Sequence, residues 1–102
     1  MSEMYEYIES LKEKHNSNQS IVYILEYCQT CLTDENLVLA PQTISVDENH
    51  CDVKVSFENG VKLIFHEGKD DEVKILYSGE TKNGLAVRDC SWEDILRFLT
   101  NN

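Results

Sequence analysis

Hydrophobic and polar residues alternate most regularly in residues 51–67, with a single short Glu-Asn-Gly interruption. Such alternation is typical of strands with one buried face, and an Asn-Gly pair between two of them is typical of a β-hairpin. A two-residue loop would place Phe57 opposite Lys62 and mix the two faces. A three-residue loop with a left-handed Gly60 pairs Phe57 with Val61 and keeps one face apolar, so we expect this register.

Three other stretches repeat apolar residues at intervals of three and four, which predicts helices. The first runs from about Ser2 to Lys14, the second follows the polar break at residues 15–19, and the third follows Ser91, a candidate N-cap. The residues expected on the packed faces are Met1, Met4, Ile8 and Leu11 in the first helix, Ile21, Ile24, Leu25, Cys28, Cys31 and Leu32 in the second, and Trp92, Ile95, Leu96 and Leu99 in the third.

Shorter alternations predict a strand around Ile44, another from Val73 to Tyr77, and a last one around Leu85 and Val87. Polar turns separate these strands, one of them in residues 78–84, and short connections favour antiparallel pairing. We therefore expect an α+β fold: a four- to five-stranded antiparallel meander with two N-terminal helices and one C-terminal helix packed on one face. Residues 1–102 are expected to form a single domain, because a chain of this length buries one core.

Acidic residues dominate the charge of the chain. Nineteen Asp and Glu face nine Lys and Arg, so the formal net charge is -10, with -7 in residues 1–51 and -3 in residues 52–102. This balance argues against direct binding to nucleic acid or to an anionic membrane, and it favours a basic protein partner. No apolar run has membrane-spanning length and no signal peptide is recognisable, so we expect a cytoplasmic protein.

The first predicted helix carries a row of glutamates. Glu3 and Glu13 are ten residues apart, about 15 Å along a helix, so a carboxylate recurs about every 5 Å. The phosphates of one DNA strand recur about every 3.4 Å, so the row is a loose mimic of nucleic acid. The predicted partner-binding residues are Glu3, Glu6, Glu9, Glu13, Asp34, Glu35, Asp47 and Glu48. The simpler alternative is an acidic exterior that only maintains solubility.

Cys28 and Cys31 form a C-x-x-C sequence, which can indicate redox chemistry or zinc. The pair falls near the end of the second helix, where the helix dipole disfavours a thiolate, and both residues are on its apolar stripe. Cys51, Cys90 or His50 would have to complete a zinc site, without the usual local spacing. We therefore predict buried thiols, no metal and no cofactor.

A catalytic site is not predicted. The hairpin register places Asp52 opposite His66, which is half of a hydrolytic triad, but no nucleophile with a recognisable motif accompanies the pair. The protein is therefore expected not to be an enzyme.

In its small size, its acidic first helix from Glu3 to Glu13 and its lack of catalytic motifs, the chain resembles the small acidic inhibitors of phages and mobile elements, including anti-CRISPR and anti-restriction proteins. The resemblance implies an inhibitor that blocks the nucleic-acid-binding groove of a basic effector, such as a CRISPR effector or a nuclease. Alternatives are a bacterial immunity protein against a nuclease toxin, a small thiol or zinc protein using Cys28 and Cys31, and a module that dimerises through Ile64 and Leu76 on the open sheet face. We expect the protein to be a monomer or a homodimer.

Overall fold

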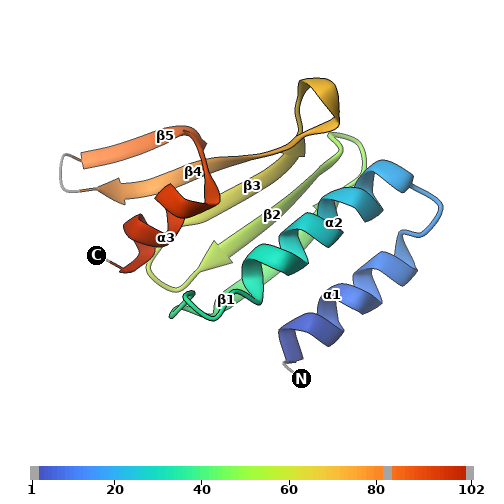
Figure 1. The fold of residues 1–102 in the computed structure, drawn as a ribbon, viewed down its shortest axis with the longest axis horizontal. Coiled ribbons are helices and arrows are strands. Elements are labelled where there is room, and N and C mark those ends of the chain that lie inside the picture. The colour runs from blue at the N-terminus through green and yellow to red at the C-terminus, as the bar shows by residue number, and fades with distance from the viewer. Residues whose placement is uncertain (1–2, 82–83, 101–102) are drawn as a thin grey trace.

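The computed structural model describes residues 3–81 and 84–100, and side chains within 3–79 and 89–99. In this part of the chain, helices and a five-stranded sheet form an α+β fold (Figure 1). The elements are α1 (Glu3–Lys14), α2 (Gln19–Leu32), β1 (Pro41–Asp47), β2 (Asp52–Phe57), β3 (Lys62–Glu67), the short 3-10 turn η1 (Lys69–Asp71), β4 (Val73–Thr81), β5 (Gly84–Cys90) and α3 (Trp92–Thr100). Met1 and Ser2, predicted in the first helix, and Asn83, predicted in a turn, lie outside the described residues.

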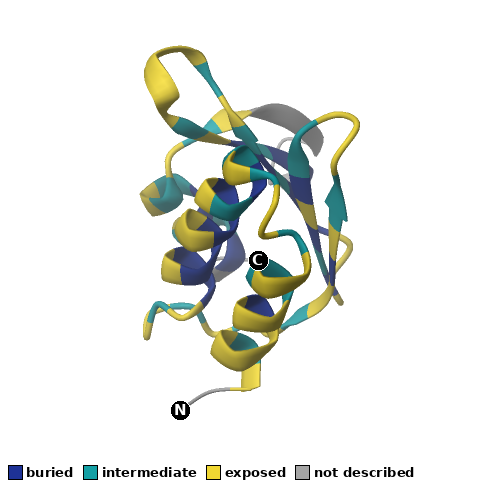
Figure 2. Cartoon of the chain, turned by 90° about the vertical axis from the view of Figure 1, so that its right-hand side faces the viewer, coloured by how far each residue is buried: buried dark blue, intermediate teal, exposed yellow. Residues whose placement is uncertain are grey.

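The sheet is a meander. Its strands lie in the order β1-β2-β3-β4-β5, and each neighbouring pair is antiparallel. The helices lie on one face of the sheet (Figures 1 and 2): α2 packs on β2 and β3, α3 packs on β4, and α1 runs beside α2 in the opposite direction. The predicted architecture is confirmed, including two helices before the sheet and one after it.

The core lies between the sheet and α2, because the inward residues of the central strands and the apolar stripe of α2 face each other (Figure 2). Both sets follow the periodicity of their element, two in the strands and about 3.6 in the helix. The largest fully buried side chains are Tyr77, Phe65, Ile8, Ile21, Ile24, Leu25, Leu63, Ile75, Ile95, Val53, Val55 and Cys28.

The β2–β3 hairpin has the predicted register. The backbone N–H of Phe57 donates to the carbonyl of Val61 at 2.9 Å, and that of Gly60 donates to the carbonyl of Phe57 at 3.1 Å. Gly60 has a φ of 87°, in the left-handed region that glycine adopts without steric cost. This register keeps one face of the hairpin buried.

The alternation suggested that the hairpin begins at Cys51, but β2 begins at Asp52. Cys51 has a φ of 53° and lies with His50 in the turn between β1 and β2. Asp47 organises this turn, since its Oδ1 accepts from the backbone N–H of His50 at 3.1 Å and its Oδ2 lies 2.8 Å from the Nδ1 of His50. A short polar side chain that bonds to the backbone competes with strand pairing, which explains why β2 begins one residue later.

Strand β4 is longer than predicted, because residues 78–81 continue it instead of turning. Gly79 is buried in this part of the strand, and a Cβ there would lie 3.0 Å from both the Tyr77 hydroxyl and the Val61 side chain. Glycine thus marks a close approach of the Tyr77 ring, whereas the sequence pattern suggested a turn.

Helix α3 packs around a slightly different face from the one predicted. Ile95 and Leu99 are buried as expected, but Trp92 and Leu96 are only half-buried. Phe98, which was not predicted to pack, has its ring centroid 5.0 Å from that of Tyr77. Ser91 is the N-cap, since its Oγ accepts from the backbone N–H of Asp94 at 3.2 Å.

Candidate functional site

The outward side of α1 and α2 is an acidic surface. Glu6 and Glu13 lie two turns apart on α1, and Glu26 lies on the exposed side of α2, which runs next to it. These three residues define the acidic helix face. Where side chains are described, none of the three carboxylates takes part in an ion pair or a side-chain hydrogen bond. The face therefore presents free negative charge to solvent.

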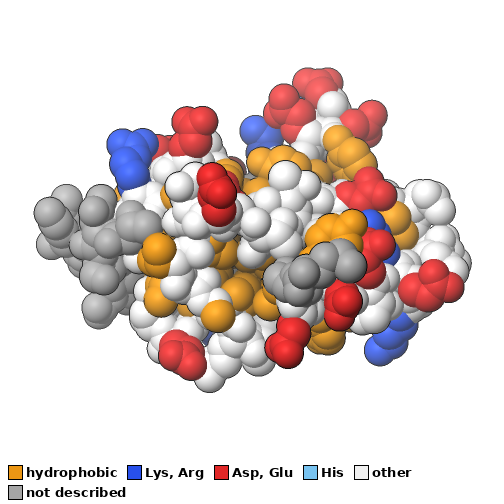
Figure 3. Space-filling model, turned by 60° about the horizontal axis from the view of Figure 1, so that its bottom comes forward, with side chains coloured by type: hydrophobic (Ala, Val, Ile, Leu, Met, Phe, Trp, Pro, Cys, Tyr) orange, Lys and Arg blue, Asp and Glu red, His pale blue; other side chains and the backbone are white. Residues whose placement is uncertain are grey.

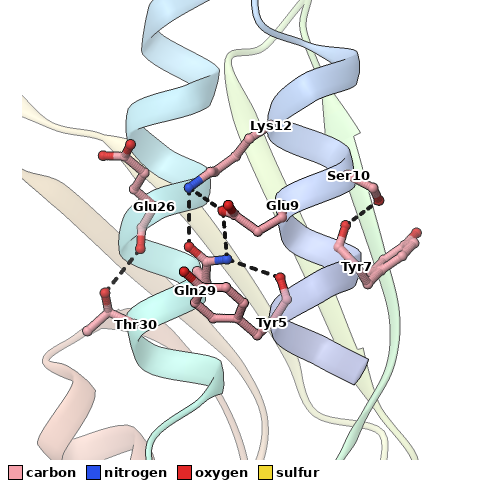
Figure 4. A network of polar contacts seen from close by, with 8 residues as sticks. All are labelled: Tyr5, Tyr7, Glu9, Ser10, Lys12, Glu26, Gln29 and Thr30. Carbon is pink, nitrogen blue, oxygen red and sulfur yellow. Dashed lines mark hydrogen bonds and ion pairs between the residues drawn. The ribbon is translucent and has the colours of Figure 1, made fainter. Parts of the chain in front are cut away.

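Glu9 belongs to the same row in the sequence but has an internal role (Figure 4). Its Oε2 lies 2.5 Å from the Lys12 Nζ and accepts from the Gln29 Nε2 at 3.0 Å. Gln29 is 7% exposed, and it also donates to the Tyr5 carbonyl at 3.1 Å and accepts from Lys12 at 3.3 Å. The hydrogen bonds from Lys12 and then Gln29 lower the pKa of Glu9. This carboxylate joins α1 to α2, although 44% of its side chain remains exposed.

Asp34 also has structural partners. Its Oδ1 accepts from the backbone N–H of Asn36 at 2.8 Å, and its Oδ2 accepts from the Trp92 Nε1 at 3.0 Å. These bonds, that of Asn36 first, lower the pKa of Asp34. The contact with Trp92 ties the end of α2 to the start of α3. Glu35, the next residue, is exposed.

Asp47 is the last residue of β1 and Glu48 begins the turn after it, near the other end of α1. The His50 side chain, followed by the His50 backbone N–H, lowers the pKa of Asp47. Glu48 Oε1 lies 3.4 Å from the Nδ1 of His15, the residue that follows α1. The eight predicted residues therefore do not form one row. Four exposed glutamates share α1, one of which, Glu9, is bonded to α2, and the other four predicted residues lie near the two ends of α1.

Sequence reasoning missed Glu26 and a set of exposed tyrosines on the two helices. The exposed large hydrophobic residues are Tyr5, Tyr7, Tyr23, Tyr27 and Val38. Tyr23 could have been noticed in the sequence, because it falls on the polar side of the α2 pattern. Tyrosine is enriched at protein interfaces, since one end of the ring is apolar and the other is polar. The aromatic residues thus favour protein binding by this side of the molecule.

Cys28 and Cys31 are buried and free. Burial is the main cause that raises the pKa of both thiols, that of Cys31 to about 12. Both are therefore protonated at neutral pH, which disfavours nucleophilic or redox use. Within residues 3–81 and 84–100, no cluster of three or more His, Cys, Asp or Glu side chains is placed to hold a metal ion.

The open face of the sheet carries Asp52 and His66 in the predicted cross-strand position. The Nε2 of His66, however, lies 3.5 Å from Asp89 Oδ1 on β5, and Asp52 Oδ1 is buried without a hydrogen-bond partner among the described atoms. Ile64 and Leu76 are half-buried neighbours on the same face. Asp52 and His66 therefore do not form an oriented imidazole–carboxylate pair among the described contacts.

The comparisons with known proteins found no matching family model, no matching curated protein and no matching solved structure. In the part of the chain that the structure describes, no helix is both long enough and apolar enough to cross a membrane.

Proposed function

We propose that the protein is a non-enzymatic inhibitor that binds a basic, nucleic-acid-handling protein through the acidic helix face. The observation that supports this most directly is the exposure of Glu6, Glu13 and Glu26 on two adjacent helices, free of internal partners. Carboxylates in this state steer a positively charged partner from a distance and select it by electrostatic complementarity. The proposed targets are the nucleic-acid-binding grooves of CRISPR effectors, restriction enzymes and nucleases, including nuclease toxins, for which the protein acts as a nucleic-acid mimic.

The size of the acidic helix face fits the centre of an interface. With 12 and 14 residues, α1 and α2 are about 18 and 21 Å long. Packed helices lie about 10 Å apart, so the pair presents roughly half of the 800 Å² that each partner buries in a standard interface. Exposed Glu35 beyond the end of α2 and Glu48 beyond β1 extend the acidic surface at its two ends.

A pair of charge-matched variants tests the proposal. The first carries Glu6→Lys, Glu13→Lys and Glu26→Lys, and the control carries Glu58→Lys, Glu67→Lys and Glu72→Lys, three exposed positions away from the helices. Both variants change the formal net charge equally. We expect the first to weaken binding and inhibition of the target enzyme by about 100-fold or more at low salt, and the control to change them much less.

Glu9 is left unchanged in this design, because its loss would disturb the contact between α1 and α2. The thermal midpoints of both variants should stay close to that of the parent, since all six positions are exposed. Equal losses in the two variants would mean that only overall charge matters, and full inhibition by the first variant would remove the acidic helix face from the interface.

A further inference from the structure

A groove lies between α1 and the edge strand β1. It is lined by Met4 and Tyr7 of α1 and by residues 41–44 of β1, and it encloses about 320 Å³. Tyr7 is 48% exposed, and its side chain points away from α2 (Figure 4). Ile44 is buried at the side of the groove that β1 forms, and Gln42 and Thr43 add polar groups, so the groove offers a partly apolar pocket beside the sheet.

Strand β1 lies at one edge of the sheet. β2 pairs with one side of β1, and in the part of the chain that is described no strand pairs with the other side. Every second backbone N–H and C=O of an edge strand points away from the sheet and can bond to an added strand. The pairing with β2 is regular from Thr43 to Asp47, after an irregularity between Pro41 and Thr43. A five-residue edge is therefore available next to the pocket.

We propose that this groove takes up an extended cationic segment of a partner protein, which pairs with β1 as a sixth strand and places an apolar side chain among Met4, Tyr7 and Ile44. Backbone bonds along a sheet edge, combined with a pocket for alternate side chains, are a known mode of peptide recognition. The inference goes beyond the proposed function, because the groove is on the flank of α1 that faces β1, whereas the acidic helix face points outward.

Charge decides which kind of strand fits. Glu3 and Glu6 lie in the first turn of α1, next in the sequence to the pocket residues Met4 and Tyr7, and Asp47 and Glu48 lie at the far end of β1. On the face that includes the start of α1, Asp and Glu side chains surround exposed hydrophobic ones and Lys and Arg are few (Figure 3). A segment that carries Lys or Arg complements these acidic side chains. A second copy of the chain does not, because each copy has a net charge of -10.

The test uses a defined probe and the whole chain. The probe is a seven-residue peptide of alternating lysine and valine with a central leucine, acetylated and amidated at its ends. Titration into the isotope-labelled protein should shift the NMR signals of the β1 amides and of the Met4 and Ile44 methyl groups, in a saturable manner. The amides of β5, the other edge of the sheet, serve as the internal control. Shifts confined to β5 or absent from β1 would overturn the proposal.

Backbone methylation of the probe tests strand pairing directly. A peptide methylated at every internal backbone nitrogen keeps the side chains and the charge but loses the donors. We expect binding to weaken by about tenfold or more, because a few backbone hydrogen bonds are lost. Equal binding of the two peptides would show a purely electrostatic contact and overturn the proposal.

Two tyrosine variants test the pocket. Tyr7 and Tyr23 are equally exposed, 48% each, but only Tyr7 lines the groove. Tyr7→Ala should weaken the probe several-fold and Tyr23→Ala should leave its affinity unchanged. Equal effects of the two variants would contradict the proposal, as would β1 shifts that depend on protein concentration without probe, since these would assign the edge to a second copy.

The outcome is separable from that of the proposed function. In the Glu6→Lys, Glu13→Lys, Glu26→Lys variant, the probe should still shift the β1 amides, although with lower affinity. Probe binding at β1 without inhibition of any effector would leave the groove assignment standing and reject the inhibitor. Inhibition without probe binding would support the inhibitor and reject the groove assignment.

Discussion

The missing side chain of Gly79 leaves room for the Tyr77 ring in the core. A Cβ at residue 79 would lie 3.0 Å from the Tyr77 hydroxyl and from Val61 Cγ2, closer than side chains normally pack. Gly79→Ala should therefore reduce the free energy of unfolding by about 1–3 kcal/mol, the usual cost of overpacking. Urea denaturation measures the change.

Ser78→Ala is the matched control, because Ser78 directly precedes Gly79 in β4 and points to the open face. It should change the stability by less than about 0.5 kcal/mol. A Gly79→Ala variant as stable as the parent would mean that Tyr77 and Val61 can move apart without loss.

Gln29 joins the first two helices. It is buried, and its amide makes one bond each to the Tyr5 carbonyl, to Glu9 and to Lys12. Gln29→Leu leaves the Tyr5 carbonyl without this donor and separates Lys12 from α2, so we expect a loss of about 1–3 kcal/mol. Hydrogen exchange should rise mainly in α1, because its contacts with the rest of the fold are chiefly with α2.

Thr30→Ala provides the comparison for Gln29. Thr30 is the exposed neighbour, and its hydroxyl donates to the Glu26 carbonyl one turn earlier in the same helix. The loss of this local bond should leave the exchange of α1 unchanged. Equal exchange in the two variants would show that apolar contacts alone hold α1.

The helices and strands could be predicted because their signals are local. The alternation on both sides of Gly60 determines the faces of β2 and β3, and the spacing of Ile21, Ile24 and Leu25 determines the buried stripe of α2. Element boundaries were less accurate where a side chain changed the backbone, as Asp47 does before β2.

The state of each carboxylate could not be predicted, because its partner lies far away in the sequence. Glu6 and Glu9 look alike in the sequence, but only Glu9 meets Gln29, 20 residues later. Asp34 meets Trp92, 58 residues later. The groove beside β1 was missed for the same reason, since it needs two elements that no local pattern relates.

Three carboxylates with structural partners make the stability of the fold depend on pH. The pKa values of Glu9, Asp34 and Asp47 are lowered from their ordinary values of 4.5, 3.8 and 3.8. A group with a lower pKa in the folded state stabilises the fold above its unfolded pKa, and this contribution is lost as the pH falls through the folded pKa. The free energy of unfolding should therefore decline below about pH 4 through these groups.

Asp34→Asn isolates one of the three. It should lower the stability at pH 6 and reduce the difference between pH 6 and pH 3, because the variant has no carboxylate to protonate. The fluorescence of Trp92, the single tryptophan, reports both unfolding and its contact with residue 34. Glu58→Gln, at an exposed loop position, should leave the pH dependence unchanged. An unaltered dependence in Asp34→Asn would assign the acid sensitivity to other groups.

The sequential order of the strands has a consequence for folding kinetics. Each strand finds its partner in the next segment of the chain, so the sheet can grow hairpin by hairpin without closing a long loop. A growing polypeptide can therefore assemble β1 to β3 before the later strands have been synthesised. The bond between Trp92 and Asp34 can form only at the end, when α3 arrives and completes the native state.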